Sequence, residues 1–158
     1  MIMKRTIAIL AVVLLTFVSG PAQVKKEKQM EKREISPWKW QDELSYVQAV
    51  EVKNVQSTLY CAGQAAVHAD GTSSNAPMKE QIIEALQNLE LVISTAGYEP
   101  KGIVRLNIYS TSEKELFEHF DIVQAWIARH GIKQATTVFQ VVSLYKTLKV
   151  EFEATVVK

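Results

Sequence analysis

Two carboxylates near the end of the chain are the first candidates for chemistry. Glu151 and Glu153 stand two residues apart in an apolar stretch that predicts a strand. A carboxylate enclosed in a cleft has a raised pKa, which suits it to proton transfer. Glu151 is therefore a candidate catalytic residue. The alternative interpretation is a side chain that simply faces solvent.

Arg105 is the candidate cation for holding a ligand. It shares one face of a strand predicted for residues 103–109 with Ile103, Asn107 and Tyr109, so it belongs to an unusually polar group for a covered sheet. A guanidinium can hold a carboxylate by two hydrogen bonds. The alternative, which we prefer, is a structural arginine that lies over the surface or pairs with Glu151 or Glu153.

The other reactive side chains are isolated. Cys61 is the only cysteine, so the chain forms no disulfide within itself, and its apolar neighbours predict a buried thiol. His68 and His119 lack the spacing of metal ligands. The sequence holds no glycine-rich phosphate loop and no triad of nucleophile, base and acid. We therefore expect neither a metal nor a cofactor.

The composition is that of an ordinary folded domain. The 158 residues suffice for one domain with a single moderate core. Apolar residues make up 47% of the chain and charged residues 22%, which argues against disorder. The formal net charge of +1 gives no basic surface for nucleic acid, so we expect no nucleic-acid partner.

The first 22 residues have the layout of a secretory signal peptide. A positive start, Met1–Arg5, precedes the apolar stretch Thr6–Val18, and the small residues Gly20 and Ala22 flank a cleavage position before Gln23. The apolar stretch is shorter than the roughly 20 residues that cross a bilayer. An uncleaved signal anchor is the alternative, and it is the only membrane contact we expect. The protein is therefore expected to be periplasmic or secreted.

A charged segment separates this signal from the folded domain. Residues 23–35 are dense in charges of both signs and predict a solvated linker or a loose helix with no binding role. Residues 36–158 then form the domain. It opens on Trp38 and Trp40, which alternate in an extended pattern and are expected to cover a hydrophobic edge or a neighbouring subunit.

Periodicity predicts an α+β fold with the element order β-β-α-β-α-β-β. Turn-forming residues at 53–57 join the first two strands as a hairpin. The two helices lie on one face of a mixed sheet, so the other face is expected to need a partner. The elements are predicted near residues 47–55, 58–67, 78–95, 103–109, 112–131, 136–142 and 148–157.

Each of the two predicted helices has an apolar stripe, which is expected to pack on the sheet. The first helix opens at Pro77 and stops at Gly97, and the second is capped by Ser112 with Glu115 in a capping box and ends at Gly131. The first stripe is Ile82, Leu86, Leu89 and Ile93, widened by Ile83, Leu91 and Val92; the second is Phe117, Phe120, Val123 and Ile127.

An ordered set of short stretches resembles the Rid (YjgF) family, whose best-known members hydrolyse reactive imines and enamines made by amino-acid-metabolising enzymes. The resemblance implies the Rid/chorismate-mutase-like fold and a homotrimer with small-molecule clefts at the subunit boundaries. The stretches are Tyr46–Val50, Leu59–Gln64, Asn88-Leu89 with Ala96-Gly97, Ile103–Tyr109 and Leu148–Ala154.

The same resemblance implies roles for individual residues. Thr136 stands at the position of the arginine that grips the substrate carboxylate in catalytically competent Rid proteins, and Val138 stands at a position where the family often has cysteine. The cleft residues it implies are Tyr46 as an aromatic wall, Gly63 as a close backbone approach, Glu151 as a carboxylate that positions water, and Asp121 at a pocket asparagine.

These implications leave two functions open. The first is hydrolysis of a small imine, enamine or related C=N compound. Because Thr136 has no charge, the substrate need not be an imino acid, and we expect a neutral ligand or one held by another residue. The second is a non-catalytic trimer outside the cytoplasm that binds a small metabolite or acts through protein contacts. A third, weaker hypothesis is a holdase-like surface built on Trp38 and Trp40.

Overall fold

A computed structural model describes residues 28–158. The predicted signal peptide and the first residues of the charged segment, up to residue 27, lie outside the described residues. Among residues 28–158, none of the helices combines the length and the apolar composition that crossing a bilayer demands.

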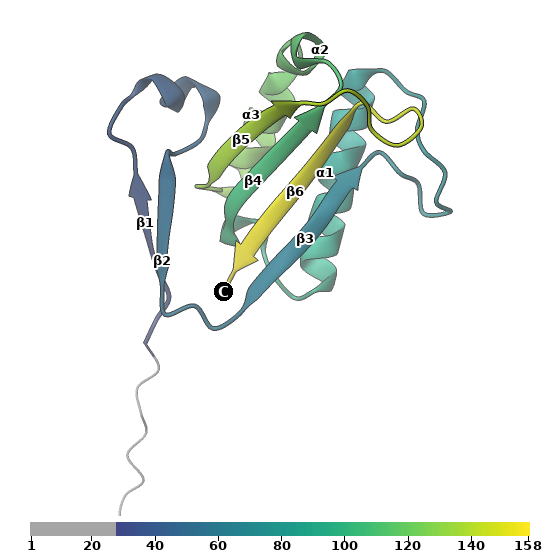
Figure 1. Cartoon of the computed structure of the whole chain (residues 1–158). Helices are drawn as coiled ribbons and strands as arrows, with labels where there is room; N and C mark the ends of the chain where they lie inside the picture. Colours follow the sequence, from purple (N-terminus) through teal and green to yellow (C-terminus); the bar gives the residue numbers. More distant parts are fainter. Residues whose placement is uncertain (1–27) are drawn as a thin grey trace, which may run out of the picture.

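The core of the structure is a four-stranded mixed sheet in the order β3-β6-β4-β5, with the helices on one of its faces (Figure 1). Strands β4 and β5 run parallel, and β6 runs antiparallel to both β3 and β4. The predicted α+β fold is therefore confirmed. The elements are β1 (Glu31–Ile35), β2 (Ala49–Lys53), β3 (Thr58–Ala65), α1 (Met78–Thr95), β4 (Ile103–Ser110), α2 (Glu113–Phe117), α3 (Phe120–His130), β5 (Ala135–Gln140) and β6 (Val150–Val157), with short 3-10 turns at Trp40–Leu44 and Pro100–Gly102.

Helix α1 occupies the residues predicted for the first helix. Ile82, Leu86, Leu89 and Ile93 are all buried, which confirms the stripe that faces the sheet. The prediction that three further residues widen this stripe is wrong. Ile83, Leu91 and Val92 are 39%, 64% and 36% exposed. With 3.6 residues per turn, these three side chains lie on either side of the helix face that packs on the sheet.

The second helical segment is split. Ser112 caps α2 by accepting a hydrogen bond from the Glu115 backbone N–H at 3.2 Å, as predicted. The capping box is incomplete, because the Glu115 carboxylate binds Lys149 and the Ser112 N–H donates to Ser110 instead. The chain then interrupts the helix at Glu118 and His119 before α3 begins, and Gly131 ends α3 with a left-handed φ of 62°. Phe117 falls at the end of the short helix and is 41% exposed, so its placement in the buried stripe is wrong.

The N-terminal hairpin differs most from the prediction. Residues 31–35 form strand β1 rather than linker, and β1 pairs with β2. Strand β2 therefore does not form a hairpin with β3, which pairs with β6 instead. Opposite charges on facing positions explain how so polar a segment forms a strand: Arg33 lies opposite Glu51 and binds its carboxylate at 2.9 Å.

The hairpin docks near β5 (Figure 1). Val47 donates its backbone N–H to the Gln134 carbonyl at 3.0 Å, and Gln124 reaches the Glu43 carbonyl at 2.6 Å. Trp38 and Trp40 are 58% and 60% exposed, and Trp40 lies in a 3-10 turn instead of an extended strand. The expected extended alternation of these two residues is therefore wrong.

Strand β4 carries an extra residue near its start. Ile103 faces Val156 of β6 while Arg105 faces the adjacent Thr155, so β4 bulges between them. Ile103 is consequently fully buried, and its predicted place on the face of Arg105 is wrong. Leu106 and Ile108 lie in the core, as does Cys61. Burial raises the pKa of the Cys61 thiol.

Candidate functional site

Glu151 and Gly63 lie against each other at the end of the sheet. Strand β3 bulges between Cys61 and Gln64, where three steps along β3 face two steps along β6. A Cβ atom on Gly63 would overlap the carboxylate of Glu151. The missing side chain of Gly63 therefore leaves the space in which the Glu151 carboxylate lies.

A cavity of about 430 Å³ opens beside this pair. Its walls are mostly aliphatic, and they include Leu91 and Val92 of α1, which lie outside the buried stripe. Among the described residues that line the cavity, Glu151 is the one with a formal charge. The lining residues are Gly63, Gln64, Ala65, Val67, Asn88, Leu91, Val92, Tyr145, Leu148 and Glu151.

Asn88 fixes the wall formed by the end of β3. Its side-chain amide donates to the carbonyls of Ala65 at 2.9 Å and Val67 at 3.0 Å. These bonds hold the chain as it leaves the strand, where no neighbouring strand would satisfy both carbonyls. The sequence singled out Asn88 through the family resemblance but gave it no role.

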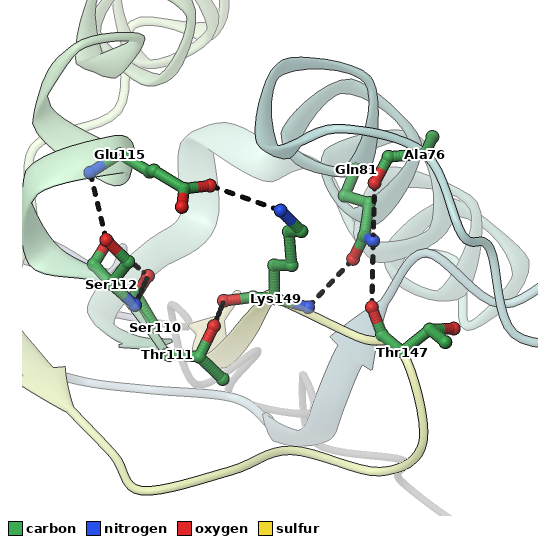
Figure 2. Close-up of polar contacts among 8 residues, drawn as sticks. All are labelled: Ala76, Gln81, Ser110, Thr111, Ser112, Glu115, Thr147 and Lys149. Atoms are coloured by element: carbon green, nitrogen blue, oxygen red, sulfur yellow. Dashed lines mark hydrogen bonds and ion pairs between the residues drawn. The ribbon is translucent and has the colours of Figure 1, made fainter.

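The loop of residues 141–149 contributes Tyr145 and Leu148 to the lining of the cavity. Gln81 holds this loop in place (Figure 2). The fully buried Gln81 amide donates to the carbonyls of Ala76 at 3.0 Å and Thr147 at 3.1 Å, and accepts from the Lys149 N–H at 2.8 Å. The ammonium of Lys149 binds Glu115 at 3.2 Å. This network positions Tyr145 and Leu148 at the cavity.

A second polar group lies on the sheet face that the helices leave open. Glu153 accepts hydrogen bonds from the Tyr109 hydroxyl at 2.8 Å and the Asn107 amide at 3.1 Å. These bonds lower the pKa of Glu153, with a smaller contribution from the charge of Arg105, and the bond from Tyr109 raises the pKa of that phenol. Arg105 is exposed and forms no ion pair with a described residue.

Thr136 lies away from Glu151 within one chain. Its hydroxyl accepts a hydrogen bond from Gln134 at 3.1 Å. Strand β4 lies between the strands that carry these two residues. Thr136 of β5 is opposite Leu106 of β4, whereas Glu151 of β6 is opposite Tyr109 of β4. With standard strand geometry, this offset across two strand spacings separates the two Cα atoms by roughly 14 Å.

Tyr46 and Asp121 also lie apart from Glu151. Tyr46 lines a cavity of about 600 Å³ between the hairpin and the end of α3, and its ring lies 6.3 Å from that of Trp40. Asp121 is exposed and lines a cavity of about 390 Å³ between α1 and α3. Of the site residues predicted from the sequence, a single chain therefore brings only Gly63 next to Glu151. Tyr46 and Thr136 lie near each other elsewhere, on either side of the bridge between Val47 and Ala135.

The fold matches that of known proteins. In structure, the chain is similar to YyfB from Yersinia pestis, which is described as a member of the conserved Rid protein family. The TM-score is 0.66 at 27% identity, and the match covers 80% of this chain and 98% of YyfB. A family model described as Endoribonuclease L-PSP matches residues 40–158, most of the chain. The chain belongs to the Rid family.

Other relatives agree with this assignment. A RutC family protein from Aquifex aeolicus is 29% identical over 113 residues, which are 72% of this Rid protein and 88% of the relative. The chain is also similar in fold to TdcF from E. coli, whose structure was solved with bound serine. The TM-score is 0.60 at 23% identity, and the match covers 72% of this chain and 87% of TdcF.

Proposed function

We propose that this Rid protein hydrolyses small imines or enamines that carry no carboxylate, with Glu151 as the catalytic carboxylate. The observation that carries the proposal is the position of Glu151 over Gly63 at an apolar cavity. Apolar cavities with a few well-placed polar groups are typical small-molecule sites.

In this mechanism Glu151 accepts a proton from water while the water oxygen bonds to the carbon of the C=N group. Glu151 then returns the proton to the nitrogen of the resulting carbinolamine. The C–N bond then breaks with its electron pair on nitrogen while the hydroxyl proton passes to that nitrogen, so ammonia leaves and the C–OH group becomes the carbonyl. One imine and one water are thereby converted to one carbonyl compound and one ammonia.

Thr136 supports the exclusion of substrates with a carboxylate. At the position where the family resemblance implies an arginine, it offers a neutral hydroxyl that already accepts a hydrogen bond from Gln134. A hydrogen bond to a charged group contributes about 1.5–3 kcal/mol, so the missing guanidinium removes a large part of the affinity for an imino acid.

Release of ammonia from freshly formed imines tests this function. We expect the protein to accelerate hydrolysis of imines without a carboxylate and to leave 2-iminobutanoate nearly unchanged. Glu151→Gln should lower the rate about 100-fold or more, the typical contribution of general-base catalysis. If folded protein accelerates neither class, the catalytic proposal is wrong.

A non-catalytic function is the second candidate. Thr136 favours a non-catalytic function, because its hydroxyl is neutral and already accepts a hydrogen bond from Gln134. The site therefore has one carboxylate and no cation at the family's arginine position. In that case a small metabolite binds beside Glu151 without turnover. Ligands would raise the melting temperature while no ammonia is released.

Association into a homotrimer is part of both proposals. Tyr46 and Glu151 are too far apart to form one site in a single chain, and the open sheet face carries the stacked rings of Tyr109 and Phe139, 5.2 Å apart. A neighbouring copy could cover this face and complete a site at the boundary. We expect sedimentation equilibrium at micromolar concentration to give a trimer mass; a monomer would contradict the proposal.

Export is proposed from the first residues of the sequence. A positive start, a short apolar stretch and small residues before Gln23 form a secretory signal. We expect mass spectrometry of the protein purified from its own cells to give a mature N-terminus at Gln23. A mature chain that begins at Met1 would contradict cleavage.

A further inference from the structure

We propose that the cavity beside Glu151 selects cationic apolar ligands, namely protonated alkyl amines and the iminium ions related to them. This inference rests on the proposed function and names its substrate class. It is carried by the charge, the aromatic rim and the aliphatic walls of one cavity.

The first observation is an uncompensated negative charge. Glu151 is half-buried and forms no ion pair with any described residue, and no lysine, arginine or histidine is among the described residues that line the cavity. Lys149, two residues before Glu151, directs its ammonium to Glu115 instead. A carboxylate beside apolar walls is stabilised by a cation, and a ligand can supply one.

The second observation is an aromatic ring at the cavity that already receives a cation. The ammonium of Lys146 lies 4.9 Å from the centroid of the Tyr145 ring. Tyr145 is 64% exposed and lines the same cavity as Glu151. Ring faces attract ammonium groups. Since Lys146 lies over one face of the Tyr145 ring, the opposite face is the one that offers a favourable contact to a positively charged ligand.

The third observation is the shape and chemistry of the remaining wall. Leu91 and Val92 of α1 and Leu148 of the loop present aliphatic surface to a volume of about 430 Å³. Such a wall accommodates a short alkyl or aryl group and excludes a second charge. A ligand that carries a carboxylate would be repelled by Glu151 as well.

The reaction of such a ligand balances without a cofactor. Water bonds to the carbon of R₂C=NH₂⁺ while Glu151 takes one of its protons, and that proton is returned to nitrogen. The C–N bond then breaks with its electron pair on nitrogen, and the hydroxyl proton passes to the leaving ammonia. The products are R₂C=O and NH₄⁺.

Binding of three molecules with the same carbon skeleton tests the inference independently of turnover. The probes are isopentylamine, isopentanol and isovalerate, which are cationic, neutral and anionic at neutral pH. Calorimetry on the full-length protein should show the amine binding about tenfold more tightly than the alcohol, as expected for one ion pair in a partly enclosed site. Isovalerate should show no binding.

Two variants assign the preference to one carboxylate. Glu151→Gln keeps the shape of the side chain and should reduce the affinity for the amine to that for the alcohol. Glu153→Gln, two residues away and outside the lining residues, should keep the tenfold preference. Equal binding of the three probes, preferential binding of isovalerate, or an unchanged preference in Glu151→Gln overturns the inference.

The outcome separates this inference from the proposed function. Selective amine binding without ammonia release from any imine would support the ligand class and refute catalysis. Hydrolysis of imines without any preference for the amine over the alcohol would support catalysis and refute the ligand class.

Discussion

Gly63→Ala is expected to remove nearly all Glu151-dependent activity while the protein stays folded. The added Cβ would overlap Oε1 and Cδ of Glu151. Because these atoms are the end of a flexible side chain, the carboxylate can move away at little cost to stability. Gly63 also lacks the positive φ that would penalise alanine. We expect the rate of imine hydrolysis to fall about 100-fold, similar to the loss of a general base.

A matched glycine provides the control. At Gly102 a Cβ would lie 2.5 Å from the backbone oxygen of Val157, which cannot move aside as a side chain does. Gly102→Ala should therefore lower the melting temperature, whereas Gly63→Ala should leave it within a few degrees of the wild type. Wild-type kinetics in Gly63→Ala would contradict the role of this close approach.

Combining the two site substitutions sharpens the test. If Gly63→Ala acts by displacing the Glu151 carboxylate, Gly63→Ala/Glu151→Gln should be no slower than Glu151→Gln alone. Additive losses would show that Gly63 contributes to activity by another route.

Gln81→Leu is expected to cause the largest loss of stability. The fully buried Gln81 amide makes three hydrogen bonds that join α1 to the chain on both sides of it, and leucine would leave the backbone groups of Ala76, Thr147 and Lys149 without these partners. Each unsatisfied buried group costs about 1–3 kcal/mol, so the free energy of unfolding should fall by roughly 3–5 kcal/mol. Urea denaturation measures it.

Gln87 of the same helix is the matched control for Gln81. It is exposed, and Gln87→Leu should change the free energy of unfolding by no more than about 0.5 kcal/mol. Hydrogen exchange adds a local readout, since the Lys149 amide should lose protection in Gln81→Leu. Similar stabilities for the two variants would show that the Gln81 bonds add little.

The sequence predicted those elements whose signals are local. Pro77 and Gly97 flank a helix with a clear period of 3.6, and α1 runs from Met78 to Thr95 between them. Strand β1 was missed because its pattern is charged. In the structure Arg33 of this strand pairs with Glu51 of β2, and this pairing across 18 residues is not visible in the strand itself.

The candidate site was predicted in part. The family resemblance implied one cleft with Tyr46, Gly63, Glu151 and Asp121. The structure places Gly63 and Glu151 in contact, whereas Tyr46 and Asp121 line other cavities of the same chain. The walls of the cavity were missed because Leu91 and Val92 were assigned to the core, and apolar character alone does not separate a core residue from one that lines a cavity. The roles of Asn88 and Gln81 depend on backbone carbonyls that only the folded chain brings near.

The bulge that accommodates Glu151 also affects how β3 meets other molecules. In the part of the chain that the structure describes, β3 is the outer strand of its sheet, and Tyr60 on it is 79% exposed. Regular outer strands act as templates for aggregation, and natural proteins interrupt them with bulges. The irregularity at Cys61–Gln64 should therefore help this protein to remain dispersed at high concentration.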